Sequence, residues 1–327
     1  MSIKLISQIP VRQLIYNMQG QNYWFNGCME FLMECLGEDK AYDYWFFSGV
    51  TGDSFIQMYS KNPENMVLCY SHNMTDLVLK KAFDACGYNY NYYKDINNDN
   101  REALDQRIRK YIDHNTPVIA RVNDAFHSLA IICGYDNNDF YYILGEEKEP
   151  KPYRYDELIF VTDKKSKPLL ADVYRKAVMD IPSYISMIET KDYSFGKKAF
   201  MDWAESFQNG MFDAISSDSK IWYTHANLYF SCWNMHGTYL CILGTNGCAE
   251  GFLHDALAKN PDMTFINELI PLYITQNRNG FDILIQMESG FNIKPEVIKN
   301  KNRMRPISNK IMELSRYCDE ILTVFKN

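Results

Sequence analysis

One cysteine has the sequence surroundings of a nucleophile. Cys28 follows an Asn and a Gly in the stretch QNYWFNGCMEFLMECLGEDK, residues 21–40. Apolar residues recur after it with the three- and four-residue spacing of a buried helical face, so we expect a helix that begins at Cys28 and ends near Gly37. The free N–H groups and the partial positive charge at a helix N-terminus favour a thiolate. The position therefore predicts a reactive thiol rather than an ordinary buried cysteine.

His127 is the predicted base for this thiol. It opens the apolar run HSLAIICGYD, and a second apolar run, DFYYILGEE, follows at once. A histidine on a strand that faces a cysteine at a helix start can take the thiol proton and leave a nucleophile that is charged at neutral pH. Cys248, in GTNGCAEGF, is a rival nucleophile at another Gly-flanked helix start, but no strand led by His lies near it in the sequence.

A third catalytic group should orient the imidazole from the end of the next strand. The sequence offers Glu146 at this point, in ILGEEKEP, and Glu146 is the predicted third member of the triad. Because side chains alternate between the faces of a strand, Glu147 stays open as an alternative. Asp136, in the turn between the two apolar runs, is another.

The tetrahedral intermediate of acyl transfer requires an oxyanion hole. The backbone N–H of Cys28 and one side-chain amide are the groups that we expect to form it. Asn22, six residues before Cys28, is the predicted amide, and the neighbouring Gln21 is the alternative.

Elements of two kinds must position these residues. Helical spacing predicts helices in MTDLVLKKAFDACG and in NREALDQRIRKYIDHN, and the two glycines of SGVTGDSF predict a tight loop. The runs TPVIARVN, HSLAIICGYD, DFYYILGEE and YDELIFVTD are rich in Val, Ile, Tyr and Phe, and turn residues separate them. They predict consecutive antiparallel strands. A group of helices followed by a sheet is an α+β order.

The second half of the chain has a different character. After the charged, Pro-containing segment TDKKSKP, residues 162–168, most segments carry helical spacing. This change predicts a boundary near residue 165, with a catalytic domain over residues 1–165 and a mostly helical domain over residues 166–327.

Composition argues against several classes of protein. The net charge of −7 disfavours nucleic-acid binding, and the chain lacks the run of 18 or more apolar residues that a membrane span requires. Nine cysteines without CxxC pairs or regular spacing favour reduced thiols over a disulfide framework and give no metal-ligand pattern. We therefore expect a cytoplasmic protein with no metal, no nucleic-acid partner and no membrane partner.

Two long stretches resemble a known family. GCMEFLMECLGEDKAYDYWFFSGVTGDSFIQMY, followed by FHSLAIICGYDNNDFYYILGE, is similar to the papain-like cysteine-peptidase-fold acyltransferases of antibiotic biosynthesis, of the butirosin acyltransferase type. The shared features are the Cys-led helix, the Gly-rich loop and the His-led strand that ends in Gly-Tyr-Asp. The sequence departs from the family pattern at Asn22, where these enzymes commonly carry Gln, and at the third residue, where Gly-Glu stands in place of Asp-Pro.

The resemblance implies a fold and an activity. The fold is α+β, with a papain-like domain of helices and a short antiparallel sheet. Family members move an acyl group from a carrier-protein thioester to an amine. The implied partners are therefore an acyl or peptidyl carrier protein and a small amine or diamine, with phosphopantetheine present only on the carrier and no other cofactor. The resemblance also puts Gly49 and Gly52 beside Cys28, where they would shape the acyl pocket, with Asp53 in reach of the substrate amine.

A basic segment near the C-terminus is a candidate docking surface. KPEVIKNKNRMRPISNK, residues 294–310, carries Lys299, Lys301, Arg303 and Arg305 against a single acidic residue. Either a solvated loop or a docking patch for an acidic carrier protein explains this composition.

Three classes of function remain open on the sequence. The first is an acyltransferase or amide synthetase that acts on carrier-bound thioesters, and the second is a cysteine peptidase or amide hydrolase with the same dyad. The third is a binding protein that has lost catalysis. The long helical half favours the first over a minimal peptidase, and the Cys28–His127 pair argues against the third.

Overall fold

The computed structural model describes most of the chain, and the parts it describes form two compact units. The described residues are 3–7, 9–10, 13–16, 20–21, 23–61, 76–122, 129–210, 220–223, 228–231, 248–288 and 293–326. The first unit combines Met1–Thr51 with Met74–Leu169, and the second combines Gly52–Asn73 with Leu170–Asn327. We describe each unit by itself.

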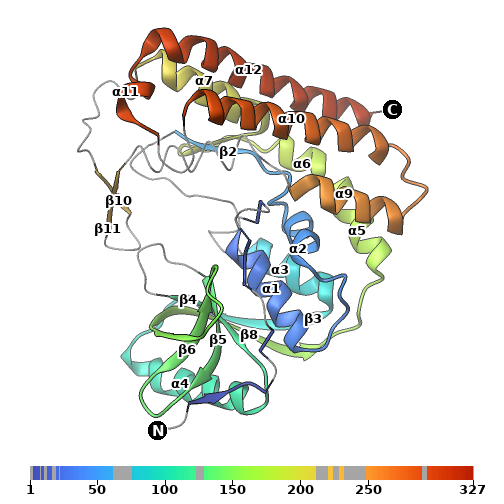
Figure 1. Ribbon diagram of the computed structural model, residues 1–327. Helices are drawn as coiled ribbons and strands as arrows, with labels where there is room; N and C mark the ends of the chain where they lie inside the picture. The colour runs from blue at the N-terminus through green and yellow to red at the C-terminus, as the bar shows by residue number, and fades with distance from the viewer. Residues whose placement is uncertain are drawn as a thin grey trace. The chain divides into compact units, whose positions relative to one another are not determined.

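The first unit is built on an antiparallel sheet (Figure 1). Its strands follow the order β3-β8-β4-β5-β6-β7, and β1 pairs with β5 beside this path. The predicted consecutive antiparallel strands are confirmed, and the strand after α3 joins them at the edge of the sheet. The strands are β1 (Lys4–Leu5), β3 (Tyr88–Tyr93), β4 (Val118–Val122), β5 (Leu129–Tyr135), β6 (Phe140–Leu144), β7 (Lys151–Tyr153) and β8 (Tyr155–Lys164).

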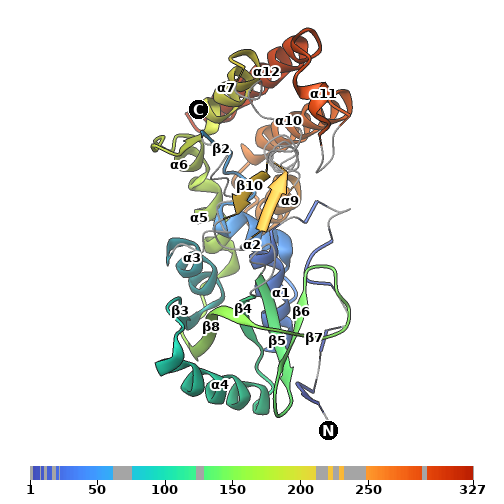
Figure 2. The ribbon, with the colours of Figure 1, turned by 90° about the vertical axis from the view of Figure 1, so that its left-hand side faces the viewer.

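Helices cover both faces of this sheet. They are α1 (Trp24–Cys35), α2 (Tyr44–Thr51), α3 (Asp76–Cys86) and α4 (Asn98–Asp113). α1 and α4 both pack against β4 and β5, and they lie on opposite sides of these strands (Figures 1 and 2). Strands β4 and β5 are therefore buried on both faces, which explains their nearly continuous apolar sequences. We call the two sides the α1 face and the α4 face.

The register of the strands assigns side chains to these faces. The Arg107 guanidinium of α4 lies 4.4 Å from the centre of the Phe160 ring, so Phe160 of β8 points to the α4 face. Glu157 lies three residues before Phe160 on the same strand and therefore points to the α1 face. Arg121 pairs with Glu157 on one side and with Leu129 on the other. Because paired residues of antiparallel strands share a face, Arg121 and Leu129 also point to the α1 face.

The second unit is mostly helical, as the spacing of its apolar residues predicts. Its helices are α5 (Leu170–Met179), α6 (Ile181–Ile185), α7 (Gly196–Gln208), α9 (Cys248–Lys259), α10 (Ile266–Gln286), α11 (Pro295–Ile298) and α12 (Lys301–Val324). α12 packs against α7 and α10, and α9 packs against α5 and α10. Two short antiparallel strand pairs accompany them. They are β2 (Met58–Ser60) with β9 (Tyr193–Phe195) and β10 (Lys220–Tyr223) with β11 (Leu228–Ser231).

The division of the chain differs from a single boundary near residue 165. The chain passes into the second unit at Leu170, a few residues later than expected, but Gly52–Asn73 also belongs to the second unit. The reason is long-range pairing, since Met58 of β2 pairs with Phe195 of β9. Within the described part of the chain, no helix is both long enough and apolar enough to cross a bilayer.

Candidate active site around Cys28

Cys28 lies inside a helix rather than at its start. α1 begins at Trp24, so Cys28 is its fifth residue, and the prediction that the helix begins at Cys28 is wrong. The N–H groups left free at a helix start belong to the first turn, and the N–H of a fifth residue is directed at the carbonyl four residues before it. In this geometry the Cys28 N–H is not a free donor for an oxyanion. The C-terminal stop at Gly37 is confirmed, because Gly37 has a φ of +68° and its N–H donates to the Glu34 carbonyl.

Gly27 allows the backbone of Leu14 to approach α1 closely. A Cβ atom at this position would lie 1.8 Å from the carbonyl oxygen of Leu14, so only glycine allows this contact. The N–H of Leu14 in turn donates to the carbonyl of Gly145, over 2.9 Å. Gly145 directly follows β6, whose last residue, Leu144, pairs with Ala130 of β5. The N-terminal half of α1 therefore lies at the end of the sheet where β5 begins.

The other end of α1 fixes its direction along β5. The Cys133 thiol of β5 is close enough to Cys35 to raise its pKa, although burial and Glu34 have the larger effects. Cys28 lies seven residues before Cys35, which is about 10 Å along the axis of the helix and nearly the same side of it. Leu129 lies four residues before Cys133, which is about 13 Å along the strand. Helix and strand thus run in the same direction, with Cys28 near the level of Leu129.

The Cys28 thiol is fully buried in the described state. Its exposed fraction is 0%, and burial raises the pKa of the thiol well above its usual value. A thiol in this environment is protonated at neutral pH, so it needs a base to act as a nucleophile. The predicted base, His127, lies outside the described residues, two positions before Leu129 in the sequence.

The register separates the three carboxylates proposed as the third catalytic group. Glu146 follows Gly145 at the end of the sheet where β5 begins, and its side chain is exposed. Asp136 lies at the opposite end of β5, about 20 Å away along the strand. Its carboxylate accepts hydrogen bonds from the N–H groups of Asn138 and Asp139, both over 2.8 Å. Asp136 therefore has a turn-forming role far from the level of Cys28.

Glu147 is held by strand β7 on the α4 face. Its Oε1 accepts hydrogen bonds from Lys151 Nζ over 2.7 Å and from the hydroxyl of Tyr153 over 2.9 Å. The Tyr153 ring packs edge-on against Tyr142, which pairs with Ile132 and shares the α4 face with it. The Glu147 side chain is thus drawn away from the α1 face, where Cys28 lies.

Of the two candidate oxyanion amides, the structure describes Gln21. Its side chain is 6% exposed, and its Oε1 accepts a hydrogen bond from the N–H of Tyr16 over 3.0 Å. This bond fixes the orientation of the amide. Among the residues that the structure describes, no acceptor bonds to the Gln21 Nε2, so the amide group keeps a donor for a ligand. Asn22 lies outside the described residues.

The Gly-rich segment is largely helical rather than a tight loop. Gly49 lies within α2 of the first unit, so the loop predicted for SGVTGDSF begins only after Thr51. Gly52 belongs to the second unit and does form a turn, with a φ of +94° and the ring of Tyr184 2.8 Å from the position of a Cβ. Asp53 follows it and is 1% exposed. The role of Asp53 toward an amine stays a prediction.

A partly buried ion pair on the α1 face was missed by sequence reasoning. Arg121 Nε donates to Glu157 Oε2 over 3.0 Å, and the hydroxyl of Tyr92 donates to the same oxygen over 2.7 Å. Burial and the bond to Glu157 raise the pKa of Tyr92. Arg121 pairs with Leu129, so this cluster lies at the level of Cys28 as well. The available signal was Arg121 inside the otherwise apolar strand VIARV, together with the acidic residues at the start of YDELIF.

The basic segment near the C-terminus is mostly helical, so the loop expected in one of its two interpretations is wrong, and the docking patch stays a prediction. Lys299 follows α11, and Lys301, Arg303 and Arg305 lie in the first turns of α12. Arg303 is a structural contact, because its guanidinium donates to the Gln286 carbonyl over 2.9 Å and pairs with Glu288 at 3.0 Å. The side chains of the other three are exposed.

The structure describes the side chains of five of the cysteines. All the cysteines whose side chains the structure describes are free, namely Cys28, Cys35, Cys86, Cys133 and Cys318. In the described part of the chain, no group of three or more His, Cys, Asp or Glu side chains has the arrangement of a metal site. Cys248 is the first residue of α9, as the sequence predicts. Comparison with known protein-family models and with curated proteins gives no match to this chain.

Proposed function

We propose that the protein is a thiol-dependent acyltransferase with a papain-like catalytic unit, which forms amides from carrier-bound acyl thioesters. The observation that carries the proposal is the alignment of α1 with β5, which brings Cys28 to the level of Leu129. His127 itself lies outside the described residues, but it precedes Leu129 by only two positions in the sequence, and this closeness supports the pair predicted from the sequence. The resemblance to butirosin-type acyltransferases gives the substrate class.

The proposed reaction has two steps with one base. His127 takes the thiol proton of Cys28, and the sulfur adds to the thioester carbonyl. The carrier thiol leaves with that proton, and the acyl group stays on Cys28. An amine then attacks this new thioester, loses a proton to His127, and the Cys28 sulfur leaves with that proton as the amide forms. No other cofactor is consumed, and the phosphopantetheine arm belongs to the carrier.

The burial of Cys28 supports transfer over hydrolysis. An acyl group on this sulfur would be surrounded by protein rather than by water, although the site must first open to admit the thioester, because the free thiol has an exposed fraction of 0%. The amide of Gln21 supports the same chemistry, because its carbonyl side is fixed by Tyr16 and its Nε2 is left to donate to an oxyanion. We therefore propose that the Gln21 amide donates to the oxyanion. Gln21 is the residue that the sequence analysis gave as the alternative to Asn22.

Product partitioning tests the proposal. One acyl thioester is incubated with the protein, with and without a panel of primary amines and diamines, and amide and free acid are measured separately. We expect amide to dominate at saturating amine, and we expect both products to vanish in Cys28→Ala. His127→Ala should slow both steps. Free acid that dominates across the whole amine panel would instead identify a cysteine hydrolase with the same dyad.

A further inference from the structure

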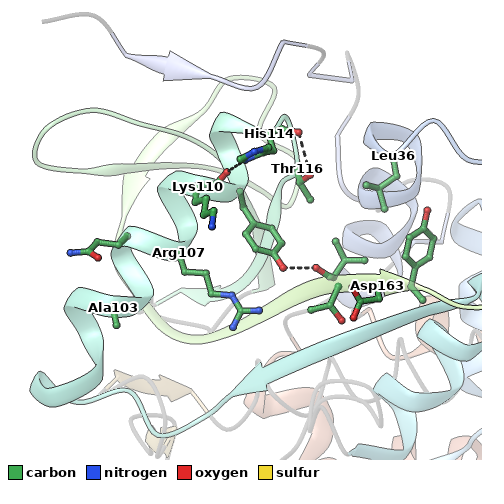
Figure 3. A pocket seen from close by; sticks show the side chains of 12 residues that line it. Leu36, Ala103, Arg107, Lys110, His114, Thr116 and Asp163 are labelled. Atoms are coloured by element: carbon green, nitrogen blue, oxygen red, sulfur yellow. Dashed lines mark hydrogen bonds between the residues drawn. The ribbon is translucent and has the colours of Figure 1, made fainter.

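A groove of about 810 Å³ lies between α4 and β8 in the first unit (Figure 3). This volume is within the range of small-molecule sites, about 300–1,000 Å³. α4 and its C-terminal residues form one wall, and the end of β8 forms the other. The lining residues are Leu36, Tyr88, Ala103, Gln106, Arg107, Lys110, Tyr111, His114, Thr116, Val161, Thr162 and Asp163. Leu36 lies at the far end of α1 from Cys28, so the groove is separate from the candidate active site.

The α4 wall of the groove is cationic. Arg107, Lys110 and His114 lie at three- and four-residue spacing along one side of the helix, and Figure 3 shows all three on this wall. Asp163, on the β8 wall, is the one acid among the described residues that line the groove. On a chain with a net charge of −7, this excess of positive charge marks the groove as a place for an anion.

Arg107 is held in place by neutral groups. Its guanidinium donates to the Asn91 side-chain oxygen over 2.7 Å and to the Tyr93 hydroxyl over 2.6 Å. The guanidinium also lies over the ring of Phe160, 4.4 Å from its centre. No carboxylate of the described residues pairs with Arg107. Its charge is therefore uncompensated, and its orientation is set before any ligand binds, which lowers the entropic cost of binding.

Neighbouring groups on the same wall are also fixed. The Nδ1 of His114 lies 2.6 Å from the Lys110 carbonyl, which can only accept, so Nδ1 carries a proton, and Nε2 can donate to a phosphate oxygen only in the protonated imidazolium. The hydroxyl of Tyr111, which lines the groove, donates to the Val161 carbonyl over 2.7 Å, and this bond fixes its ring. Lys110 has an exposed ammonium group and no ion-pair partner among the described residues.

We propose that this groove binds a phosphate monoester carried on an organic group. The Arg107 guanidinium has five N–H donors and gives only two of them to Asn91 and Tyr93, so the others and the Lys110 point charge match the two negative charges and several oxygens of a phosphate better than a single carboxylate. The volume of the groove is far larger than an inorganic ion needs, and Tyr88 and Tyr111 offer aromatic surface to the rest of the ligand. The groove contains no residue of the candidate active site around Cys28, so a failure of the acyltransferase proposal would leave this proposal unaffected.

Isothermal titration of the full chain tests the site with three probes: adenosine 5′-monophosphate, inorganic phosphate and adenosine. We expect the monophosphate to bind most tightly and adenosine not to bind. Lys110→Gln should raise the Kd of the monophosphate by about threefold, the size of one partly exposed charge contact, and Lys110→Gln with His114→Gln by about tenfold. Asp163→Asn should lower the Kd by about threefold, because it removes the one opposing charge.

Lys148→Gln is the matched control, since Lys148 is exposed, lies outside the groove and loses the same charge. Its Kd should equal that of the unmodified protein. Arg107→Lys keeps the charge but not the fork and should weaken binding, with thermal unfolding measured alongside to show that the variant is folded. Equal effects of Lys110→Gln and Lys148→Gln would overturn the proposal, because the α4 cations would then serve only the C-terminal end of the helix. The proposal would also be overturned if inorganic phosphate bound more tightly than adenosine 5′-monophosphate, if adenosine bound, or if the monophosphate did not bind.

Discussion

Replacing Glu38 with glutamine should destabilise the first unit in a pH-dependent way. Glu38 directly follows Gly37, the stop residue of α1, and its side chain is only 7% exposed. Its carboxylate accepts hydrogen bonds from the Tyr88 hydroxyl and from Lys164 on one oxygen, and from Lys167 over 3.1 Å on the other. The carboxylate therefore ties the end of α1 to β3, β8 and the segment after β8.

The electrostatics of this cluster set the size of the effect. Burial alone would raise the pKa of Glu38, but the hydrogen bonds from Lys164, Tyr88 and Lys167 outweigh it and lower the pKa to about 2. At about 1.36 kcal/mol per pKa unit, the fall from 4.5 to about 2 corresponds to about 3 kcal/mol. The side chains of Lys164 and Lys167 are 56% and 36% exposed, so solvent screening reduces the contribution to on the order of 2 kcal/mol.

The sign of the pH dependence follows from the lowered pKa. The folded state holds the Glu38 proton less tightly than the unfolded state, so the stabilisation is complete above about pH 5 and disappears as the pH falls toward 2. Urea unfolding followed by circular dichroism should give a free energy of unfolding about 2 kcal/mol lower for Glu38→Gln at pH 7, and about half that difference at pH 3. Glu149→Gln, at an exposed carboxylate, is the control. A difference between Glu38→Gln and the unmodified protein that is the same at both pH values would refute this reasoning.

Two further substitutions test packing and docking. Gly27→Ala should lower the free energy of unfolding by about 2–3 kcal/mol, because its Cβ would collide with the Leu14 carbonyl; urea unfolding measures this, and a neutral effect would contradict the close approach. Lys301→Gln with Arg305→Gln should weaken the use of a carrier-bound donor several-fold and leave a small free thioester unaffected. Arg303→Gln should instead lower the free energy of unfolding by about 1–2 kcal/mol, because its contacts at the end of α10 are lost. If Arg303→Gln and the Lys301–Arg305 double variant reduced the rate with a carrier-bound donor equally, this division of roles would be wrong.

Local signals in the sequence predicted most elements but not their ends. Helices α3 and α4 and strands β4, β5 and β6 follow from apolar spacing, which depends on near neighbours alone. The start of α1 was wrong because Asn26 and Gly27 have the composition of a helix cap. The glycine is instead required by Leu14, a contact that only the folded chain makes. The helical start of α12 was missed because the segment was judged by its basic composition alone, whereas its apolar residues Met304 and Ile307 are buried.

Pairing between strands that are distant in the sequence accounts for the features that the sequence alone did not predict. Asp136 and Glu146 were both possible third residues by sequence, and the antiparallel register of β5 and β6 puts them at opposite ends of the sheet. Arg121 and Glu157 are 36 positions apart, and only the pairing of β4 with β8 brings them together on the α1 face. The grouping of Gly52 with the second unit likewise depends on β2 and β9. None of these contacts leaves a periodic signal in one sequence.

The acyl-enzyme is the central claim, and intact-protein mass spectrometry with peptide mapping tests it most directly. The protein is exposed to a panel of carrier-bound and small acyl thioesters without an amine, quenched in acid and digested. The account predicts one acyl adduct, on the peptide that contains Cys28, with its loss in Cys28→Ala and its retention in Cys35→Ala. An adduct that persists in Cys28→Ala, or that maps to Cys248, would contradict the account.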